Sequence, residues 1–176
     1  MMKENNISGY RWKLLLIVAM AIVSGFFTVV NAQEDPPRPI VVTVNGSQHL
    51  SFGAFSHGAS GGTVTINPDG TRSSSGDILL LNLGYSYTPA LFDIQANPGT
   101  VISIVNGPDV TLTGSNGGTL LLQIGASLPA SPFSTTVAWP TVTQVRIGGT
   151  LTVSGNPLAN PAGNYTGSYS VTFIQE

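Results

Sequence analysis

The sequence predicts an all-β domain, an antiparallel sandwich of two sheets, behind an N-terminal signal helix. Two observations predict this fold class. Short apolar runs recur along the chain, separated by clusters of Gly, Pro, Asn and Asp, and no stretch after the leader has helical periodicity of useful length. The last fourteen residues alternate between apolar or aromatic and polar side chains, which is the pattern of a strand with one buried face.

Composition and charge restrict the classes of function. After residue 32 the chain has seven acidic side chains, three arginines and no lysine, a net charge of about −4. A mildly acidic surface repels phosphate, which argues against nucleic acid as a partner. The chain has no cysteine, so its stability must come from the core. Because lysine usually protects exposed strand edges, a β protein without it must hide its edges or use them for pairing.

Residues 1–32 have the pattern of a secretory signal peptide. Three basic residues precede an apolar run over residues 14–30, and small residues around Ala32 fit a cleavage site before Gln33. The alternative is an uncleaved anchor, although the run is close to the shortest that spans a membrane. We therefore expect export to the periplasm, the cell surface or the medium, with membrane contact only through the signal peptide during export.

The mature chain is expected to form an arm and one domain. Residues 33–39 are acidic and rich in proline, which predicts a flexible arm, and residues 40–176 form the β domain. The β-branched run over residues 40–44 predicts the first strand. Asn45-Gly46 then predicts a two-residue hairpin turn into a second strand over residues 48–55.

The next segments are punctuated by turn residues. The sequence predicts a glycine loop over residues 57–62, a strand over 63–66 and a turn at Asn67-Pro68-Asp69-Gly70. A polar loop over residues 72–76 then leads to a continuous apolar run over 78–83, which is typical of a strand buried on both faces.

The second half of the chain follows the same rules. Strands are expected over residues 91–96, 101–105, 110–113, 120–124, 142–147 and 150–153. Ser115-Asn116-Gly117-Gly118 predicts a hairpin turn, Gly148-Gly149 a bulge or tight turn, and residues 127–140 a long loop. The final strand follows Gly163. The total is nine or ten strands.

One segment formally matches a catalytic motif. Residues 58–62 fit the G-x-S-x-G pattern with Ser60 at its centre, and His57 is adjacent. That motif works on a strand-to-helix turn above a parallel sheet, whereas here a strand follows. A glycine loop is the better interpretation, and we expect no enzymatic activity.

The sequence also predicts no metal and no cofactor. His49 and His57 are the histidines of the mature chain, and without cysteine they are too few for a zinc site. Asp69 and Asp77 flank a polar loop but lack the spacing of a calcium loop. The glutamates lie near the ends of the mature chain, which does not supply the paired carboxylates of a glycosidase.

Four blocks of sequence resemble a known family. They are Leu50-Ser51-Phe52-Gly53, Gly61-Gly62-Thr63-Val64-Thr65-Ile66-Asn67-Pro68-Asp69-Gly70-Thr71-Arg72, Gly148-Gly149-Thr150-Leu151-Thr152-Val153 and Gly163-Asn164-Tyr165-Thr166-Gly167. Together they resemble the bacterial secreted family known as domain of unknown function 4402. That family is similar to spore-coat-U domains and to chaperone–usher pilins, so the resemblance implies an immunoglobulin-like or pilin-like sandwich and no established chemistry.

The similarity to pilins implies a role in assembly for both ends of the mature chain. Pilin subunits carry a glycine fourteen residues from the C-terminus, followed by alternating apolar residues, and an N-terminal arm that completes the sheet of the next subunit. The matching residues here are Gly163, Tyr165, Tyr169, Val171 and Phe173 at the C-terminus, with Ile40, Val42 and Val44 in the arm. Gln175, where pilins have an aromatic residue, and the missing disulfide depart from the pattern, so a self-complete sandwich stays open.

Two hypotheses for function follow. The first is a secreted, non-enzymatic surface or fimbria-like structural subunit that associates through strand edges with copies of itself or with a periplasmic assembly chaperone. The alternative is a monomeric secreted binding module for a glycan or a protein, which uses the loop over residues 127–140 and its aromatic residues Phe133 and Trp139.

Overall fold

The computed structural model of the chain describes residues 38–176. The signal peptide predicted for residues 1–32 and most of the predicted arm, residues 33–37, lie outside the described residues. The described residues form strands and no helix, and all pairs of named strands are antiparallel. The predicted all-β, antiparallel class is therefore confirmed. No helix in this part of the chain is long and apolar enough to cross a membrane.

Thirteen strands follow one another along the described chain. They are β1 (Val41–Val44), β2 (Ser51–Phe52), β3 (Ala54–Ile66), β4 (Arg72–Leu81), β5 (Tyr87–Thr88), β6 (Ala90–Gln95), β7 (Val101–Asn106), β8 (Val110–Gly114), β9 (Thr119–Leu128), β10 (Phe133–Ser134), β11 (Thr143–Val153), β12 (Tyr165–Thr166) and β13 (Val171–Gln175).

The largest sheet is organised around β11. Its order is β1-β6-β11-β9-β8-β12, and β3 pairs with the second half of β11 and with β4. Along one side, β11 pairs first with β6 and then with β3, while β9 pairs along the other side. The register with β9 shifts between Ile147 and Gly149, so the predicted irregularity at Gly148-Gly149 is a bulge inside one continuous strand.

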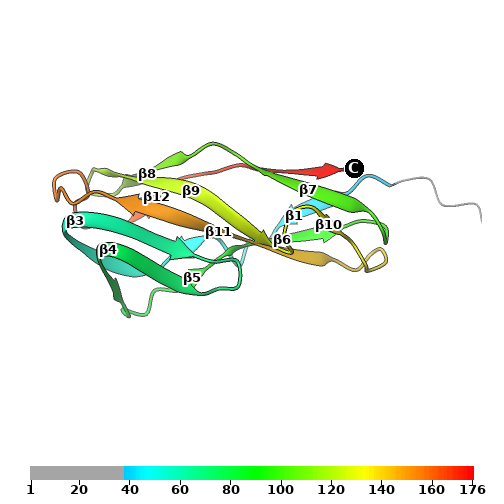
Figure 1. Cartoon of the computed structure of the whole chain (residues 1–176), viewed down its shortest axis with the longest axis horizontal. Helices are drawn as coiled ribbons and strands as arrows, with labels where there is room; N and C mark the ends of the chain where they lie inside the picture. The colour runs from blue at the N-terminus through cyan, green and yellow to red at the C-terminus, as the bar shows by residue number, and fades with distance from the viewer. Residues whose placement is uncertain (1–37) are drawn as a thin grey trace, which may run out of the picture. The chain divides into compact units, whose positions relative to one another are not determined.

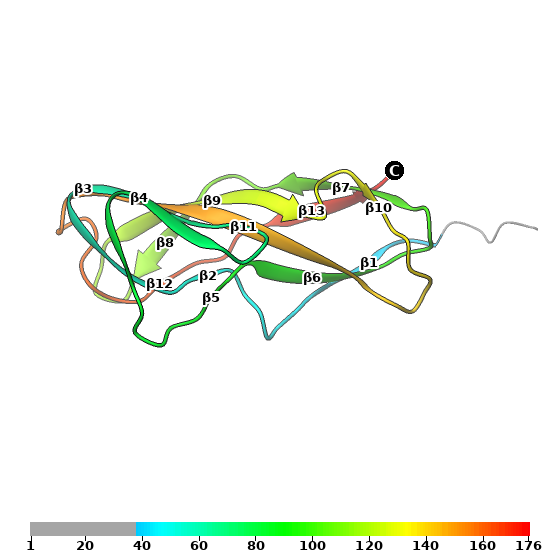
Figure 2. The same cartoon turned by 60° about the horizontal axis from the view of Figure 1, so that its bottom comes forward.

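Two smaller sheets complete the domain. One has the order β10-β7-β13 and the other pairs β2 with β5. Figures 1 and 2 show β1, β7, β10 and the C-terminus at one end of the domain, with β3, β4, β8 and β12 at the other.

The core lies on the inward faces of these sheets. The largest fully buried side chains include Ile66 on β3, Ile94 on β6, Ile102 on β7 and Ile147 on β11. Each such side chain contributes about 2 kcal/mol through removal of apolar surface from water. Because these residues come from strands far apart in the sequence, the core ties the sheets together.

Local turn chemistry was predicted well where both strands of a hairpin are neighbours in sequence. The N–H of Gly70 donates to the carbonyl of Asn67 between β3 and β4, and the N–H of Gly117 donates to that of Gly114 between β8 and β9. Asn45-Gly46 also forms a turn, in which Gln48 N–H donates to the carbonyl of Asn45. The predicted hairpin is wrong there, because β1 pairs with β6 and not with β2.

The extents of β3 and β4 differ from the prediction. β3 runs through the expected glycine loop over residues 57–62, and β4 includes the expected polar loop over 72–76. Between them the register shifts from His57 to Gly62, where Gly61 has a positive φ of 64° that glycine adopts at little cost. The apolar run after residue 77 is not buried on both faces, because β4 is an edge strand and Leu79 is exposed.

Candidate assembly surface

β1 forms an open edge of the largest sheet. It pairs with β6 along one side, and no other described strand pairs with it. Val42 lies opposite the fully buried Ile94 and thus on the core side of the sheet, yet Val42 is 37% exposed. Val44 is 62% exposed and Val41, on the other face, is 44% exposed. The backbone pairing with β6 therefore does much to hold the strand, and each of these valines keeps more than a third of its surface in water.

Ile40 connects β1 to the C-terminal strand. Of the three residues predicted to form one apolar arm face, Ile40 packs against the core, whereas Val42 and Val44 are exposed because no opposing strand covers them. The backbone N–H of Ile40 donates to Oε1 of Gln175 at 3.1 Å. A hydrogen bond of this kind contributes about 1 kcal/mol. Gln175, the polar residue that departs from the pilin pattern, thus links the residue before β1 to β13 through a hydrogen bond.

β13 brings the second group of predicted residues to the same region. It pairs with β7, where Phe173 lies opposite Ile104, and it has no described partner on its other side. The ring centroid of Phe173 lies 5.2 Å from that of Phe92 on β6, with the rings inclined at 57°. Val44 lies opposite Phe92 in the register of β1 and β6, so Phe92 lies beside β1 in the sheet and contacts β13 through its ring. Val171 also packs against the core.

Gly163 and Tyr165 lie elsewhere, beside the turn between β8 and β9. A Cβ on Gly163 would approach Oγ of Ser115 to 2.9 Å, and the N–H of Asn164 donates to that oxygen at 3.1 Å. The hydroxyl of Tyr165 donates to the carbonyl of Pro161 at 2.7 Å, and burial raises the pKa of Tyr165. The predicted final strand is therefore two strands, with Tyr165 in β12 on β8 and Phe173 in β13 on β7.

Tyr169 lies in the segment that joins β12 to β13. Its side chain packs against the core, and desolvation raises its pKa above the ordinary value for tyrosine. The inward alternation predicted for the chain end holds at Tyr165, Tyr169, Val171 and Phe173 across the break between the two strands, while Gly167 is exposed.

The loop over residues 127–140 does not offer both of its predicted aromatic contacts. Phe133 forms part of β10, lies opposite Ile102 and is buried in the core, so its side chain is not available to a ligand. Trp139 is exposed. The next residue, Pro140, accepts a hydrogen bond from Nε2 of Gln95 at 2.9 Å, which holds this part of the loop against β6.

His57, Ser60 and Asp77 gather at the irregular part of β3 and β4, but their contacts differ from those of a catalytic triad. The ring nitrogens Nδ1 and Nε2 of His57 lie 3.1 and 3.2 Å from the carbonyl oxygens of Gly58 and Asn160. Oδ2 of Asp77 accepts a hydrogen bond from the backbone N–H of Ser60 at 3.4 Å. These side chains thus bind backbone groups. Within residues 38–176, no three His, Cys, Asp or Glu side chains converge on a possible metal position.

The sequence analysis does not predict two features of this surface and one of the segment between β4 and β6. The first is the contact between the rings of Phe92 and Phe173. The second is the hydrogen bond from the N–H of Ile40 to Gln175, a residue that the sequence marks only as a departure from the pilin pattern. Neither contact has a local sequence signal, because each joins strands that lie far apart in the chain. The third feature is the exposed pair Tyr85 and Tyr87, whose spacing of two residues is a signal that the sequence does contain.

The comparisons with known proteins give one result. A model of the family described as Domain of unknown function (DUF4402) matches residues 42–174, which include nearly all of the described strands. No curated protein and no solved structure matches the chain. The chain belongs to the family Domain of unknown function (DUF4402).

Proposed function

We propose that the chain is an exported, non-enzymatic structural subunit of a bacterial surface or fimbria-like assembly, which associates through β-strand edges. In this proposal the two larger sheets form a pilin-like, immunoglobulin-type sandwich. The partner is another copy of the chain, with a periplasmic assembly chaperone as the partner before assembly. The place of action is the periplasm, the cell surface or the medium, reached through the leader over residues 1–32.

The observation that carries the proposal is the state of β1. An edge strand of apolar, β-branched residues, exposed on both faces, is a ready template for another strand. β1 has no lysine, no proline and no charged residue within Val41–Val44. A strand added along its free side would cover Val42 and Val44 and satisfy the unpaired backbone groups.

The other long edge strand is protected by its own chemistry. β4 contains Asp77 and the positive-φ residue Gly76, opposite the register shift in β3. A charge and a bulge on an edge both discourage pairing. The edge strands β2, β5, β10 and β12 have two residues each, which is too short for a stable added strand. This contrast leaves β1 and β13 as the edges for association.

The experiment compares the mature chain, residues 33–176, with a double variant, Val42→Lys and Val44→Lys. Size-exclusion chromatography with light scattering measures the mass of each. We expect the unchanged protein to form species of two or more subunits, and the variant to be monomeric because lysine on an edge opposes pairing. Leu121→Lys is the matched control, since Leu121 on β9 is also exposed but pairs with Thr111 of β8 on one side and Thr152 of β11 on the other.

A second version of the protein, beginning at Ser47, removes β1 altogether. If strand exchange is the mode of association, this version is less stable and regains stability when a peptide of residues 38–46 is added. A full-length protein that is strictly monomeric at high concentration, and unchanged by loss of β1, would contradict the proposal. That result would favour a monomeric binding module, for which the loop over residues 127–140 offers Trp139.

A further inference from the structure

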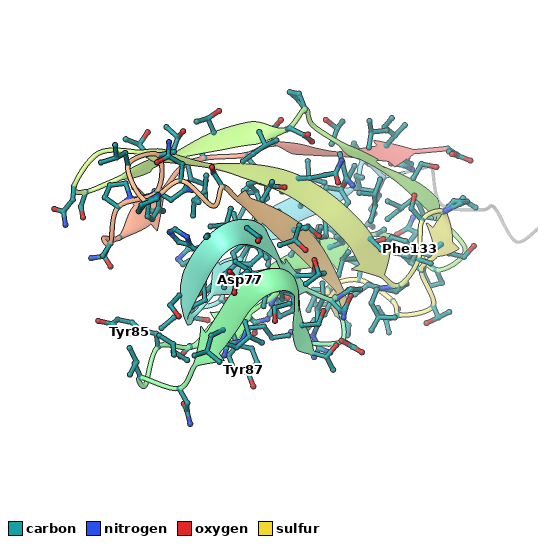
Figure 3. The ribbon with its side chains drawn as sticks, turned by 60° about the vertical axis from the view of Figure 1, so that its left-hand side comes forward. Asp77, Tyr85, Tyr87 and Phe133 are labelled. Atoms are coloured by element: carbon teal, nitrogen blue, oxygen red, sulfur yellow. The ribbon has the colours of Figure 1, made fainter. Side chains whose placement is uncertain are left out.

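The segment between β4 and β6 carries two tyrosines that contribute nothing to the core. Tyr85 is 66% exposed and Tyr87 is 45% exposed, and neither belongs to the buried cluster or packs against it. Figure 3 shows both tyrosines on the side of the domain away from Phe133, with Tyr85 before β5 and Tyr87 in it. Tyrosine, with an apolar ring and a polar hydroxyl, is enriched at binding surfaces.

Arg72 holds this segment in place. Its Nη1 donates to the carbonyls of Phe52 and Ala54 at 3.0 and 3.3 Å, and its Nη2 donates to that of Leu81 at 3.3 Å. The guanidinium carbon lies 4.3 Å from the ring centroid of Tyr87, a cation–π contact. One side chain thus contacts β2, β3, the end of β4 and a tyrosine within the segment.

The neighbouring residues also fit this arrangement. Gly53 has a φ of 65°, and a Cβ there would come within 2.6 Å of Nη1 of Arg72, so glycine is required for the approach. Oγ of Ser51 donates to the carbonyl of Ser86 at 2.7 Å, and Oγ1 of Thr88 donates to that of His49 at 2.7 Å. The two tyrosine rings are therefore presented by an ordered backbone, and little conformational entropy is lost when they bind.

The local charge is opposite to that of the whole domain. The segments that build this site, residues 49–54 and 79–89 with Arg72, contain no carboxylate. Nε of Arg72 makes no hydrogen bond with a described residue. A guanidinium has five N–H donors, and three of those of Arg72 donate to the carbonyls of Phe52, Ala54 and Leu81, so two have no described partner. The site combines a positive charge with two exposed aromatic rings, of which that of Tyr87 lies against the guanidinium.

We propose that the surface formed by Tyr85, Tyr87 and Arg72, here called the tyrosine site, binds an acidic saccharide chain. Tyr85 and Tyr87 lie two residues apart in one exposed segment, so they offer two neighbouring aromatic surfaces to sugar rings. A uronic-acid carboxylate accepts from Nε–H of Arg72, a charge-assisted hydrogen bond. This site is remote from β1 in the sheet order, and the proposal does not depend on strand-edge association.

The test uses residues 33–176 and isothermal titration calorimetry. The probes are oligogalacturonate, oligoalginate and hyaluronan oligosaccharides. Two matched controls separate the parts of the proposal: fully methyl-esterified oligogalacturonate keeps the rings without the charge, and polyglutamate keeps the charge without the rings. We expect at least one uronic-acid probe to bind, the ester to bind roughly tenfold more weakly after loss of the charged hydrogen bond, and polyglutamate not to bind.

Tyr85→Ala is the decisive variant, because Tyr85 is exposed and its removal leaves the contacts of Arg72 intact. It should weaken binding roughly three- to tenfold through lost stacking, whereas Trp139→Ala should leave binding unchanged. Circular dichroism of both variants checks that the fold is retained. The proposal is overturned if none of the three saccharides binds at millimolar concentration, if the ester or polyglutamate binds as well as the acidic chain, or if Trp139→Ala has the larger effect.

Discussion

The ring of Phe173 on the last strand packs against the ring of Phe92 on β6, with their centroids 5.2 Å apart. This contact joins the three-stranded sheet to the largest sheet at the end of the domain that holds both β1 and the C-terminus. Because β13 pairs with β7 alone, side-chain packing of this kind must supply much of what holds it in place.

Phe173→Ala should therefore lower the free energy of unfolding by about 2–4 kcal/mol, since it removes a large, partly buried ring and leaves Phe92 without its partner. Urea denaturation followed by fluorescence measures the change. Ile174→Ala is the control, because Ile174 is adjacent but exposed on the other face, and it should cost under about 1 kcal/mol. Equal costs at both positions would mean that the contact with Phe92 does not hold β13.

Gln175→Ala removes the acceptor of the Ile40 N–H and should loosen β1. We expect a cost of about 1 kcal/mol and faster amide hydrogen exchange over residues 40–44, with little change in β6. Mass spectrometry of exchanged peptides measures this difference. Gln123→Ala, on an exposed position of β9, should leave exchange in β1 as it is. Unchanged protection of residues 40–44 in the Gln175 variant would show that the β6 ladder alone fixes the strand.

Alkaline pH should destabilise the domain through Tyr169. Burial raises the pKa of Tyr169 in the folded protein above its ordinary value of 10.0, so the neutral side chain is favoured by folding. The corresponding stability is fully present below pH 10.0. It is lost as the pH rises from there through the folded-state pKa, because the unfolded chain releases its proton first.

Thermal unfolding of the unchanged protein and of Tyr169→Phe between pH 8 and pH 11 tests this. This range runs from about two units below the ordinary tyrosine pKa to about one unit above it. The Tyr169→Phe variant should lose less stability over this range than the unchanged protein. The loss that is left in the variant is due in part to Tyr165, whose pKa burial also raises. Tyr85→Phe, at an exposed position, should behave as the unchanged protein does. Parallel pH profiles for all three proteins would rule out a contribution from Tyr169.

Gly61→Ala should be among the most damaging single substitutions in the domain. Gly61 has a φ of 64°, and a Cβ there would approach the carbonyl oxygen of Val153 to 2.3 Å. Backbone atoms cannot move aside cheaply, so we expect a cost above about 2 kcal/mol. Gly46→Ala is the control, because no atom lies within 4 Å of its added Cβ. Differential scanning fluorimetry compares the two, and similar melting temperatures would contradict the role given to Gly61.

The sequence predicted the class of the fold and its local turns, because these depend on neighbouring residues. The turn at Asn67-Gly70 joins strands that are adjacent in both sequence and space, so turn chemistry was enough. Asn45-Gly46 forms its turn equally well, but the partner of β1 is β6, and that choice depends on packing between distant segments. The same limit applies to Phe133, whose burial against β7 has no signal in its own loop.

The candidate surface was predicted in part for the same reason. The inward alternation of the chain end was readable from residue to residue, and it holds at Tyr169, Val171 and Phe173. The same stretch forms two strands, one paired with β8 and the other with β7. Alternation does not predict this, because it indicates which side chains face inward and not which strand they pair with. Exposure of Val42 and Val44 follows from the missing neighbour of β1, which is also a property of the whole sheet.

The central position of β11 has a consequence for how the chain reaches this structure. β3 and β6 both pair with β11, whose residues come about fifty or more positions later in the chain. Loops of that length must close before either strand gains its ladder, so contact order is high and folding is slow. A chain that emerges N-terminus first therefore remains unfolded and accessible to proteases until residue 153, the end of β11, has emerged. A version that ends at residue 140 should accordingly be digested rapidly, while one that ends at residue 176 resists.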